Sequence, residues 1–348
     1  MTKDLFCREL LRFLPCHSDV EHLRSLFIVN CILNGILSYS TAVLNCLAIH
    51  AVKKTSFLSA SLKTILLSLA ISDLGIGLFS QPFFVVLLSK SLRNDNLGCT
   101  TYTIFTFVII FFTSASLFGV MAISLDRYMA IYLHLRYQEL VTQTRVVAGV
   151  ASLWILSAIL SLIFLWIDPN VFALTFSIAA AVCLAFTSLL YFKIYIIVRR
   201  HNFQIRRQNQ IHQDAPNDDE ISFASRKYAV GTFYVYAVFL VCYLPHAFSL
   251  LAIVIGIGPH IIMKGLYNIS LTITFLNSTL NPVVYCWKMR HIRRAMVETL
   301  RNIFRRGRNH REWKNQLTEI SFATSKYIIS FLLLKVLLLM FHWVRTVF

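Results

Sequence analysis

The segment Ser124-Leu125-Asp126-Arg127-Tyr128-Met129-Ala130-Ile131 decides how this chain is interpreted. It follows thirty residues without a charged side chain, 96–125, and it places an acid and a base side by side where that run ends. A run of about 20 apolar residues is long enough to cross a bilayer as a helix. The segment therefore marks a point at which a membrane-spanning helix meets water.

The composition of the whole chain agrees with a membrane protein. Of its 348 residues, 57% are hydrophobic and only 14% are charged. A water-soluble domain carries about 25% charged residues, so the shortage of charge indicates an outer surface that faces lipid. Cutting the sequence at Asp, Glu, Lys and Arg leaves seven long windows, the second interrupted by Asp73: 25–52, 64–89, 96–125, 146–167, 169–192, 228–263 and 265–287.

Each window is long enough to span a membrane. Lipid offers no partner to backbone polar groups, so the spans must be helices or the strands of a closed barrel. Barrel strands would alternate in polarity over about 10 residues, whereas these windows are continuously apolar. The sequence therefore predicts an all-α membrane protein, a bundle of seven transmembrane helices over residues 25–287.

The distribution of basic residues sets the orientation, because cytoplasmic segments are enriched in Lys and Arg. With the N-terminus outside, seven of the 33 basic residues fall in outer segments: Lys3, Arg8, Arg12, Arg24, Lys90, Arg93 and Lys264. We therefore expect residues 1–24 to be extracellular. The net charge of +17 then lies mostly inside, where anionic membrane lipids and a cytosolic partner explain it better than nucleic acid does.

Two segments follow the seventh window. Residues 288–304 place apolar residues at helical spacing with basic ones between them, which predicts an amphipathic helix on the inner leaflet. Residues 305–348 are first basic and then apolar, with Lys335 in the middle of the apolar part. This pattern favours a cytoplasmic tail, with a partial eighth span as the alternative.

Asp73 is the acidic residue that these windows place in the middle of a span. A carboxylate at that depth is costly and is a candidate functional residue. It could bind a cation, take up a proton or pair with polar neighbours. Ser116 lies at about the same depth in the third window, and Asn45 is a polar amide in the first that needs a partner across the bundle.

Four short motifs occur in the order and spacing of one receptor family. They are Asn45 in the first span, Leu69-Ala70-x-x-Asp73 in the second, Asp126-Arg127-Tyr128 in the third and Asn281-Pro282-x-x-Tyr285 in the seventh, with Trp154, Tyr191 and Pro245 between them. Over residues 25–304 the chain resembles a rhodopsin-like (class A) G-protein-coupled receptor. Its inner-loop run 132–137 and very short fourth-to-fifth outer loop look most like the melanocortin, adenosine and cannabinoid group.

The resemblance implies a switch at the inner face. At rest Asp126 would pair with Arg127, and an outward swing of the sixth helix about Pro245 would free Arg127 and open a groove for a heterotrimeric G protein. The residues that the resemblance implies for this switch and for coupling are Asp126, Arg127, Tyr128, Leu135, Tyr191, Pro245, Asn281, Pro282 and Tyr285.

The resemblance also implies a sodium pocket that favours the resting state. Its residues would be Asn45, Asp73, Ser116, Asn277, Ser278 and Asn281. A carboxylate ringed by neutral oxygen ligands suits a small hard cation on chemical grounds as well. We expect no other cofactor.

The implied ligand pocket is mostly apolar. Its lining would be Ile109, Ile110, Thr113, Thr175, Tyr243, His246, Leu271 and Phe275. The aspartate of amine receptors would fall at Ile109, so we expect a weakly polar or lipid-like ligand rather than a monoamine. His246 could instead serve only to hydrogen-bond within the bundle.

The sequence departs from the family at its outer disulfide. The usual cysteine at the top of the third helix is replaced by Tyr102, Cys99 stands about one turn above it, and the short outer loop holds no partner. We therefore expect no such bond. A bond from Cys99 to Cys7 or to Cys16 stays open.

The expected function is that of a plasma-membrane receptor that transmits an extracellular signal to a G protein, and not that of an enzyme. Tyr243 stands where the family has tryptophan, and Ser225 stands near the place of a glutamate that often locks the sixth helix to Arg127. Both changes could raise basal activity. The alternatives are a seven-helix protein that does not signal or signals constantly and, with less support, a small transporter, which would need repeats or a charged path.

Overall fold

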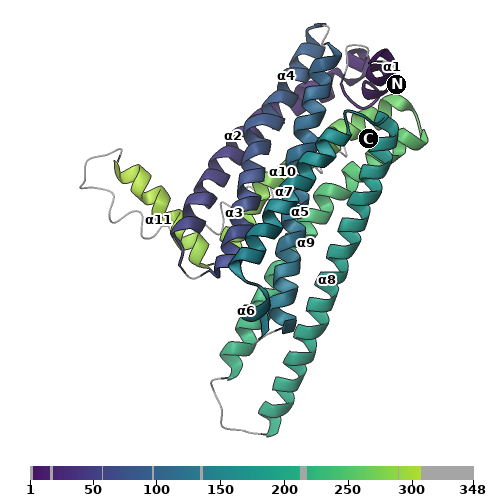
Figure 1. Cartoon of the computed structure of the whole chain (residues 1–348). Helices are drawn as coiled ribbons and strands as arrows, with labels where there is room; N and C mark the ends of the chain where they lie inside the picture. The colour runs from purple at the N-terminus through teal and green to yellow at the C-terminus, as the bar shows by residue number, and fades with distance from the viewer. Residues whose placement is uncertain are drawn as a thin grey trace.

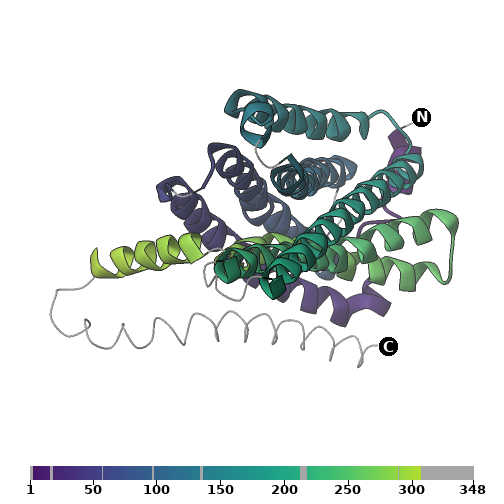
Figure 2. The same ribbon diagram turned by 90° about the horizontal axis from the view of Figure 1, so that it is seen from below.

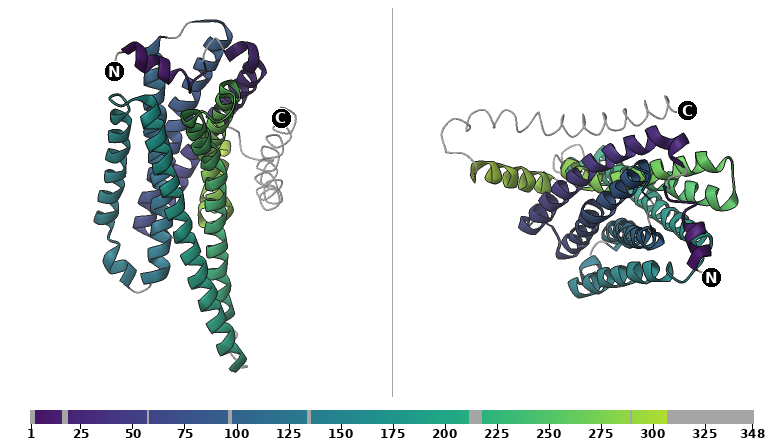
Figure 3. Two further views of the ribbon diagram at one scale, coloured as in Figure 1. Left: turned by 90° about the vertical axis from the view of Figure 1, so that its right-hand side faces the viewer. Right: turned by 90° about the horizontal axis from the view of Figure 1, so that it is seen from above.

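The computed structural model describes residues 3–15, 19–56, 58–95, 98–133, 136–211, 218–288 and 290–306. Seven long helical segments lie side by side in one bundle (Figures 1 and 3). They are α2 (Val20–Lys54), α3 (Ala60–Gly75) with its continuation, α5 (Cys99–Leu133), α7 (Gln143–Ile163), α8 (Pro169–Ile211), α9 (Asp218–Ile255) and α10 (His260–Lys288). Leu135 and the predicted tail beyond residue 306 lie outside the described residues.

Three short helices complete the described chain. Helix α1 (Lys3–Leu10) lies at the end of the bundle opposite α6 (Tyr137–Leu140). Helix α11 (Arg290–Arg306) follows α10 and projects sideways from the bundle (Figure 2). Ile292, Ala295 and Met296 on one side of α11 are buried, so a helix with one apolar face follows the seventh span, as the sequence predicts.

Six helical segments of the described chain are long and apolar enough to cross a membrane: Val20–Lys54, Ala60–Leu92, Cys99–Leu133, Gln143–Ile163, Pro169–Ile197 and Ala237–Ile255. Helix α10, the seventh, is 29 residues long and is less apolar because Asn277, Ser278 and Asn281 in its inner half face the bundle interior, where all three are buried. The prediction of a seven-helix membrane bundle is confirmed.

The second span changes its winding before Pro82. Helix α3 passes into a π-helical turn, η2 (Ile76–Ser80), and then into α4 (Gln81–Leu92). Proline lacks a backbone N–H and its ring crowds the preceding turn, and a wider π turn is one way in which a helix accommodates such a break. Gly77 lies against Thr41 of α2, where a Cβ would come within 3.0 Å of that side chain, so this glycine allows close helix packing.

Most of the apolar core of the described residues lies in two large clusters along the bundle. The outer cluster includes Phe84, Phe105 and Phe275, and the inner cluster includes Leu69 and Leu117. Asp73 follows Leu69 on α3 and Ser116 precedes Leu117 on α5, so both lie where one cluster gives way to the other. The fold thus places a polar layer between two apolar ones.

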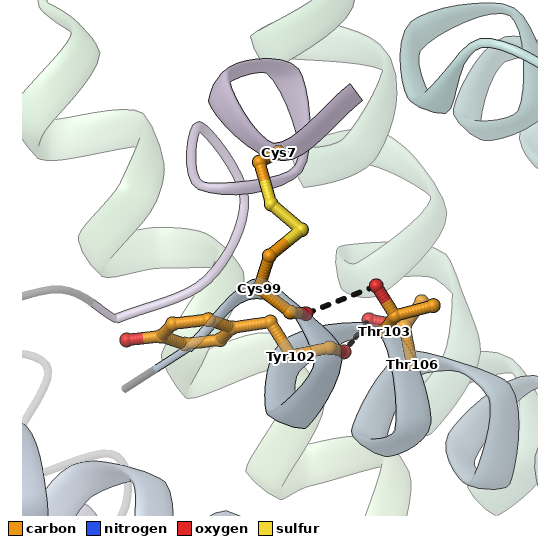
Figure 4. The surroundings of a disulfide bond; sticks show 5 residues. All are labelled: Cys7, Cys99, Tyr102, Thr103 and Thr106. Atoms are coloured by element: carbon orange, nitrogen blue, oxygen red, sulfur yellow. Dashed lines mark hydrogen bonds between the residues drawn. A yellow bond between two sulfur atoms is a disulfide. The ribbon is translucent and has the colours of Figure 1, made fainter. Parts of the chain in front are cut away.

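Residues 3–15, which we name the N-terminal cap, pack across the outer end of the bundle. Leu10, Phe13 and Leu14 are buried, with 3%, 4% and 1% of their surfaces exposed. A disulfide joins Cys7 of the cap to Cys99 at the start of α5 (Figure 4), which selects one of the two pairings that the sequence left open. The phenol of Tyr102 donates a hydrogen bond of 3.0 Å to the carbonyl of Pro15.

An ion pair ties the same region to α10. Lys264 Nζ lies 2.6 Å from Asp19 Oδ2 and donates a hydrogen bond of 2.7 Å to the carbonyl of Leu11. Only 2% of the surface of Lys264 is exposed, although the distribution of charges in the sequence predicts that this lysine lies at the outer boundary of the membrane. A buried charge is tolerated only when it is paired, so the cap and the start of α2 stabilise the outer end of α10.

The disulfide should contribute to the stability of the bundle. Cys7→Ala removes a bond that closes a loop of 92 residues, and loss of a structural disulfide typically costs about 2–4 kcal/mol. We expect the thermal unfolding midpoint of the purified protein, measured without reductant, to fall by several degrees. Cys46→Ala, at an exposed free cysteine, is the matched control, and an equal effect of the two variants would contradict a structural disulfide.

Candidate functional site

Asp73 is held by side chains from two other helices. Ser116 of α5 donates a hydrogen bond of 2.8 Å to Asp73 Oδ1, and Asn281 of α10 donates one of 2.8 Å to Asp73 Oδ2. Asp73 is fully buried. One carboxylate therefore connects α3, α5 and α10 in the middle of the bundle.

Further polar side chains surround this carboxylate. Ser278 lies beside Asp73, and the phenol of Tyr243 lies near Ser116 and Asn277. The amide of Asn45 donates a hydrogen bond of 3.0 Å to the carbonyl of Ser278, so α2 also contributes to the polar layer around Asp73. We call Asp73, Ser116 and Asn281 together with Asn45, Tyr243, Asn277 and Ser278 the central cluster.

The central cluster is rich in side-chain oxygen atoms that make no hydrogen bond of standard geometry with the described residues. These include Oδ1 of Asn45, Oδ1 of Asn277, Oγ of Ser278 and the Tyr243 hydroxyl. A carboxylate with neutral oxygens around it is the donor set that a hard monovalent or divalent cation prefers. All six residues that the sequence assigned to a sodium pocket therefore come together, and Tyr243 adds a seventh.

The inner end of α5 carries a second polar group. Arg127 Nη2 lies 2.5 Å from Asp126 Oδ2, and Nε of the same guanidinium lies 3.1 Å from that oxygen. Tyr137 of α6 donates a hydrogen bond of 2.6 Å to Asp126 Oδ1. We name Asp126, Arg127 and Tyr137 the inner latch, because the carboxylate is held from two sides and in turn holds the arginine.

Burial and the hydrogen bond to Asp126 raise the pKa of Tyr137 to about 12. The phenol of a free tyrosine titrates near pH 10, so the folded protein favours the protonated donor. The stabilisation from this shift is complete below about pH 10 and is lost as the pH rises towards 12. Tyr137 therefore remains a hydrogen-bond donor to Asp126 over the physiological pH range.

The other predicted switch residues lie along the inner half of the bundle. Tyr191 of α8 is buried, and its hydroxyl accepts a hydrogen bond of 3.0 Å from Ser124 of α5. Tyr128 packs in the small apolar cluster around Tyr191. Pro245 and Pro282 lie inside α9 and α10, while the side chain of Tyr285 lies outside the described residues.

The predicted ligand-pocket residues mostly face the interior. Seven of them are buried: Ile109, Ile110, Thr113, Tyr243, His246, Leu271 and Phe275. Thr175 is exposed on the outer face of α8, so its assignment to the pocket is wrong. The interior face of α8 passes through Ala173 and Ser177, both buried, and a residue two positions from each lies on the opposite side of a helix.

His246 has partners within the bundle. Its Nδ1 lies 3.3 Å from the hydroxyl of Ser270, which lies 2.9 Å from that of Ser249. Its ring lies 5.2 Å from the ring of Tyr267, and Tyr267 contacts Phe13 of the N-terminal cap. The histidine therefore connects the interior of the predicted pocket to the cap.

Comparison with known proteins agrees with this geometry. The family model of the 7 transmembrane receptor (rhodopsin family) matches residues 44–285. The chain belongs to the rhodopsin family of seven-transmembrane receptors. It is thus a G-protein-coupled receptor, a multi-pass protein of the plasma membrane that acts on a heterotrimeric G protein and responds to extracellular ligands.

Several curated members of the family are similar over most of the chain. The human adenosine receptor A2b is 25% identical over 285 residues, which cover 72% of this chain and 82% of that receptor. The sheep (Ovis aries) adenosine receptor A3 is 24% identical over 288 residues, 74% of this chain and 84% of that receptor. These relatives are receptors and not enzymes, as expected from the sequence.

Three site residues were missed by sequence reasoning. The family resemblance implied no role for Tyr137, which lies in the inner loop. Tyr243 was assigned to the ligand pocket alone, and Lys264 was placed on the surface. For Tyr137 and Tyr243 the sequence offers no signal, because contact across helices depends on helix rotation. For Lys264 the sequence did offer a signal. It is a lone basic residue between two apolar windows, which could have indicated a buried acidic partner.

Tyr137→Phe should weaken the inner latch. The variant removes one hydrogen bond to a carboxylate, an interaction typically worth about 1.5–3 kcal/mol when buried and less here because Tyr137 is partly exposed. We expect the receptor without ligand to accelerate nucleotide exchange on a purified G protein about two- to five-fold more than wild type, equally at about pH 6.5 and 8.5.

Tyr132→Phe is the matched control for this prediction. Tyr132 stacks on Tyr128 and is 64% exposed, so its hydroxyl should not matter for the latch. Exchange rates that are the same in wild type and Tyr137→Phe would show that Tyr137 does not restrain Arg127.

Proposed function

We propose that this receptor transmits a ligand signal by releasing Arg127 from the inner latch as α9 swings outward about Pro245. The observation that supports this most is the double restraint on Asp126, which binds Arg127 on one oxygen and Tyr137 on the other. In this arrangement the side chain of Arg127 is turned towards Asp126 and away from a cytoplasmic partner protein. Release of the guanidinium would supply the positive contact for a G-protein helix.

The environment of Pro245 supports a hinge in α9. Proline removes one hydrogen bond from a helix and disturbs the turn before it. Thr274 of α10 donates a hydrogen bond of 3.2 Å to the carbonyl of Cys242, three residues before the proline. A side chain from the neighbouring helix thus stabilises the weakened turn, which allows α9 to bend there while it remains attached to α10.

We propose further that the central cluster binds Na⁺ in the resting state. The ion would lie against Asp73 and take neutral oxygens from Ser116, Asn45, Asn277 and Ser278. A cation at this depth would compensate a carboxylate that otherwise has only neutral partners. Because Asn281 and Ser116 come from α10 and α5, the ion would hold the resting arrangement of these helices.

For the ligand, we propose a weakly polar or lipid-like molecule in the interior beneath the N-terminal cap. Ile109, Ile110, Leu271 and Phe275 supply an apolar surface, while Thr113 and His246 supply two polar groups. On the side of α5 that faces the proposed pocket, position 109 is an isoleucine and not an acidic residue. A cationic amine would therefore have no counter-ion there. A screen of lipids, nucleosides and peptides in the exchange assay tests this proposal, and a potent monoamine would contradict it.

Arg127→Ala should abolish receptor-catalysed nucleotide exchange. The variant removes the guanidinium that is proposed to contact the G protein, so we expect exchange to fall to the rate of the G protein alone, about tenfold or more below wild type. Arg145→Ala is the control, since Arg145 is an exposed residue bound to the carbonyl of Leu140. Unchanged exchange in Arg127→Ala would contradict the mechanism, and no exchange in wild type would favour a non-signalling scaffold.

Sodium should stabilise the wild-type receptor and not a variant without the carboxylate. We expect the thermal midpoint of purified receptor to rise with NaCl relative to N-methylglucamine chloride by an amount that saturates with the sodium concentration. Asp73→Asn keeps the shape of the side chain and should remove the difference between the two salts. A sodium effect of the same size in Asp73→Asn would contradict an ion at this carboxylate.

A further inference from the structure

The N-terminal cap is fastened to four helices at the outer end of the bundle. The disulfide and a hydrogen bond to Pro15 hold it to α5, and Lys264 holds it to α10. On two further sides, Asn170 of α8 donates a hydrogen bond of 2.7 Å to Glu9 Oε2, and Ser91 of α4 donates one of 3.3 Å to the carbonyl of Pro15. The cap therefore connects the outer ends of α4, α5, α8 and α10.

The cap and the outer part of α9 share one apolar core. Leu10, Phe13 and Leu14 belong to the outer apolar cluster, and so do Leu250 and Ile253 of α9. Burial of apolar surface is favourable, so these side chains hold the cap in place in addition to the disulfide. The position of the cap is therefore linked to that of α9, the helix that carries the proposed hinge.

Two ring contacts lead from the cap to this hinge. The ring centroid of Phe13 lies 6.2 Å from that of Tyr267 on α10, in an edge-to-face arrangement, and the ring centroid of Tyr267 lies 5.2 Å from that of His246. His246 directly follows Pro245 in α9. Phe13 is thus connected through Tyr267 to the residue next to the one about which α9 is proposed to swing.

The outer part of α9, residues 246–255, is fastened to α10. His246 Nδ1 lies 3.3 Å from the Ser270 hydroxyl, and the hydroxyl of Ser249 lies 2.9 Å from the same oxygen. Since Lys264 and Tyr267 bind α10 to the cap, a rotation of this part of α9 would disturb contacts that the docked cap helps to hold. The docked cap therefore opposes that rotation.

We propose that the N-terminal cap is an intramolecular inhibitor, which keeps α9 in its resting position while Phe13 packs on Tyr267. This inference rests on the proposed release of Arg127 by α9. The docked cap and the closed inner latch occur together in the structure, so the docked cap belongs to the resting state. A segment that makes its contacts in one of two states stabilises that state and lowers the population of the other.

A cap that serves only to stabilise the fold would give a different result in one pair of variants. Phe6 packs on Phe164 at the end of α7, with ring centroids 5.7 Å apart, whereas Phe13 packs on Tyr267. Phe6→Ala and Phe13→Ala both remove an aromatic contact of the cap, but only Phe13→Ala removes the one that leads to α9. Phe6→Ala is therefore the matched control.

The first test is hydrogen–deuterium exchange of purified receptor in lipid nanodiscs without G protein, so that it does not depend on signalling. We expect Phe13→Ala to increase deuterium uptake by the amides of residues 228–244, the part of α9 before Pro245, because this part opens more often once the restraint is lost. Phe13→Leu, which keeps an apolar side chain but not the ring, is the second variant if the first does not fold. Uptake that is unchanged from wild type, or raised equally by Phe6→Ala, would overturn the proposal.

The second test is nucleotide exchange on a purified G protein without ligand. Phe13→Ala should accelerate exchange about fivefold or more over wild type, and Phe6→Ala should not. Unchanged or slower exchange in Phe13→Ala, with faster exchange in Tyr137→Phe, would overturn the proposal and leave the inner switch intact. Unchanged exchange in both variants would instead contradict the switch, and deuterium uptake would then decide whether the cap restrains α9.

Discussion

The carboxylate of Asp73 sets the arrangement of this bundle. At the middle of a bilayer it has neither water nor lipid headgroups as partners, so the protein must supply them. Ser116 and Asn281 do so from α5 and α10. The rotation of both helices is thereby restrained, because turning either of them would remove one of the two hydrogen bonds to this buried carboxylate.

The remaining polar contacts restrain the bundle at two other levels. At the outer end, the N-terminal cap is bound to α5 by the Cys7–Cys99 disulfide and to α10 by Lys264. At the inner end, the inner latch holds Arg127 against Asp126. Between these levels α9 contains Pro245, whose weakened turn is stabilised from α10 by Thr274. If α9 bends at Pro245, as we propose, it would do so between two levels at which its neighbours are restrained, and this would suit it to transmit a change from one face of the membrane to the other.

Much of this architecture could be predicted from the sequence, for identifiable reasons. Uncharged runs of membrane length predict spans directly, and the residues around Asp73 are recognisable because the motifs fix both their type and their spacing. It is harder to predict which face of a membrane-spanning helix points into the bundle, because the face that contacts lipid is apolar as well. Thr175 was therefore placed inside although Ala173 and Ser177 form the inner face of α8. Contacts that depend on loop paths, such as Cys7 with Cys99 and Tyr137 with Asp126, leave no periodic signal at all.

The central claim is that Asp73 and Arg127 act in one switch. The most direct test is the rate of nucleotide exchange that purified receptor catalyses on a G protein in NaCl and in N-methylglucamine chloride, for wild type and for Asp73→Asn. We predict that sodium slows exchange by wild type and has no effect on Asp73→Asn. Equal rates in the two salts for wild type, or a sodium effect that survives in Asp73→Asn, would contradict the coupling of the two sites.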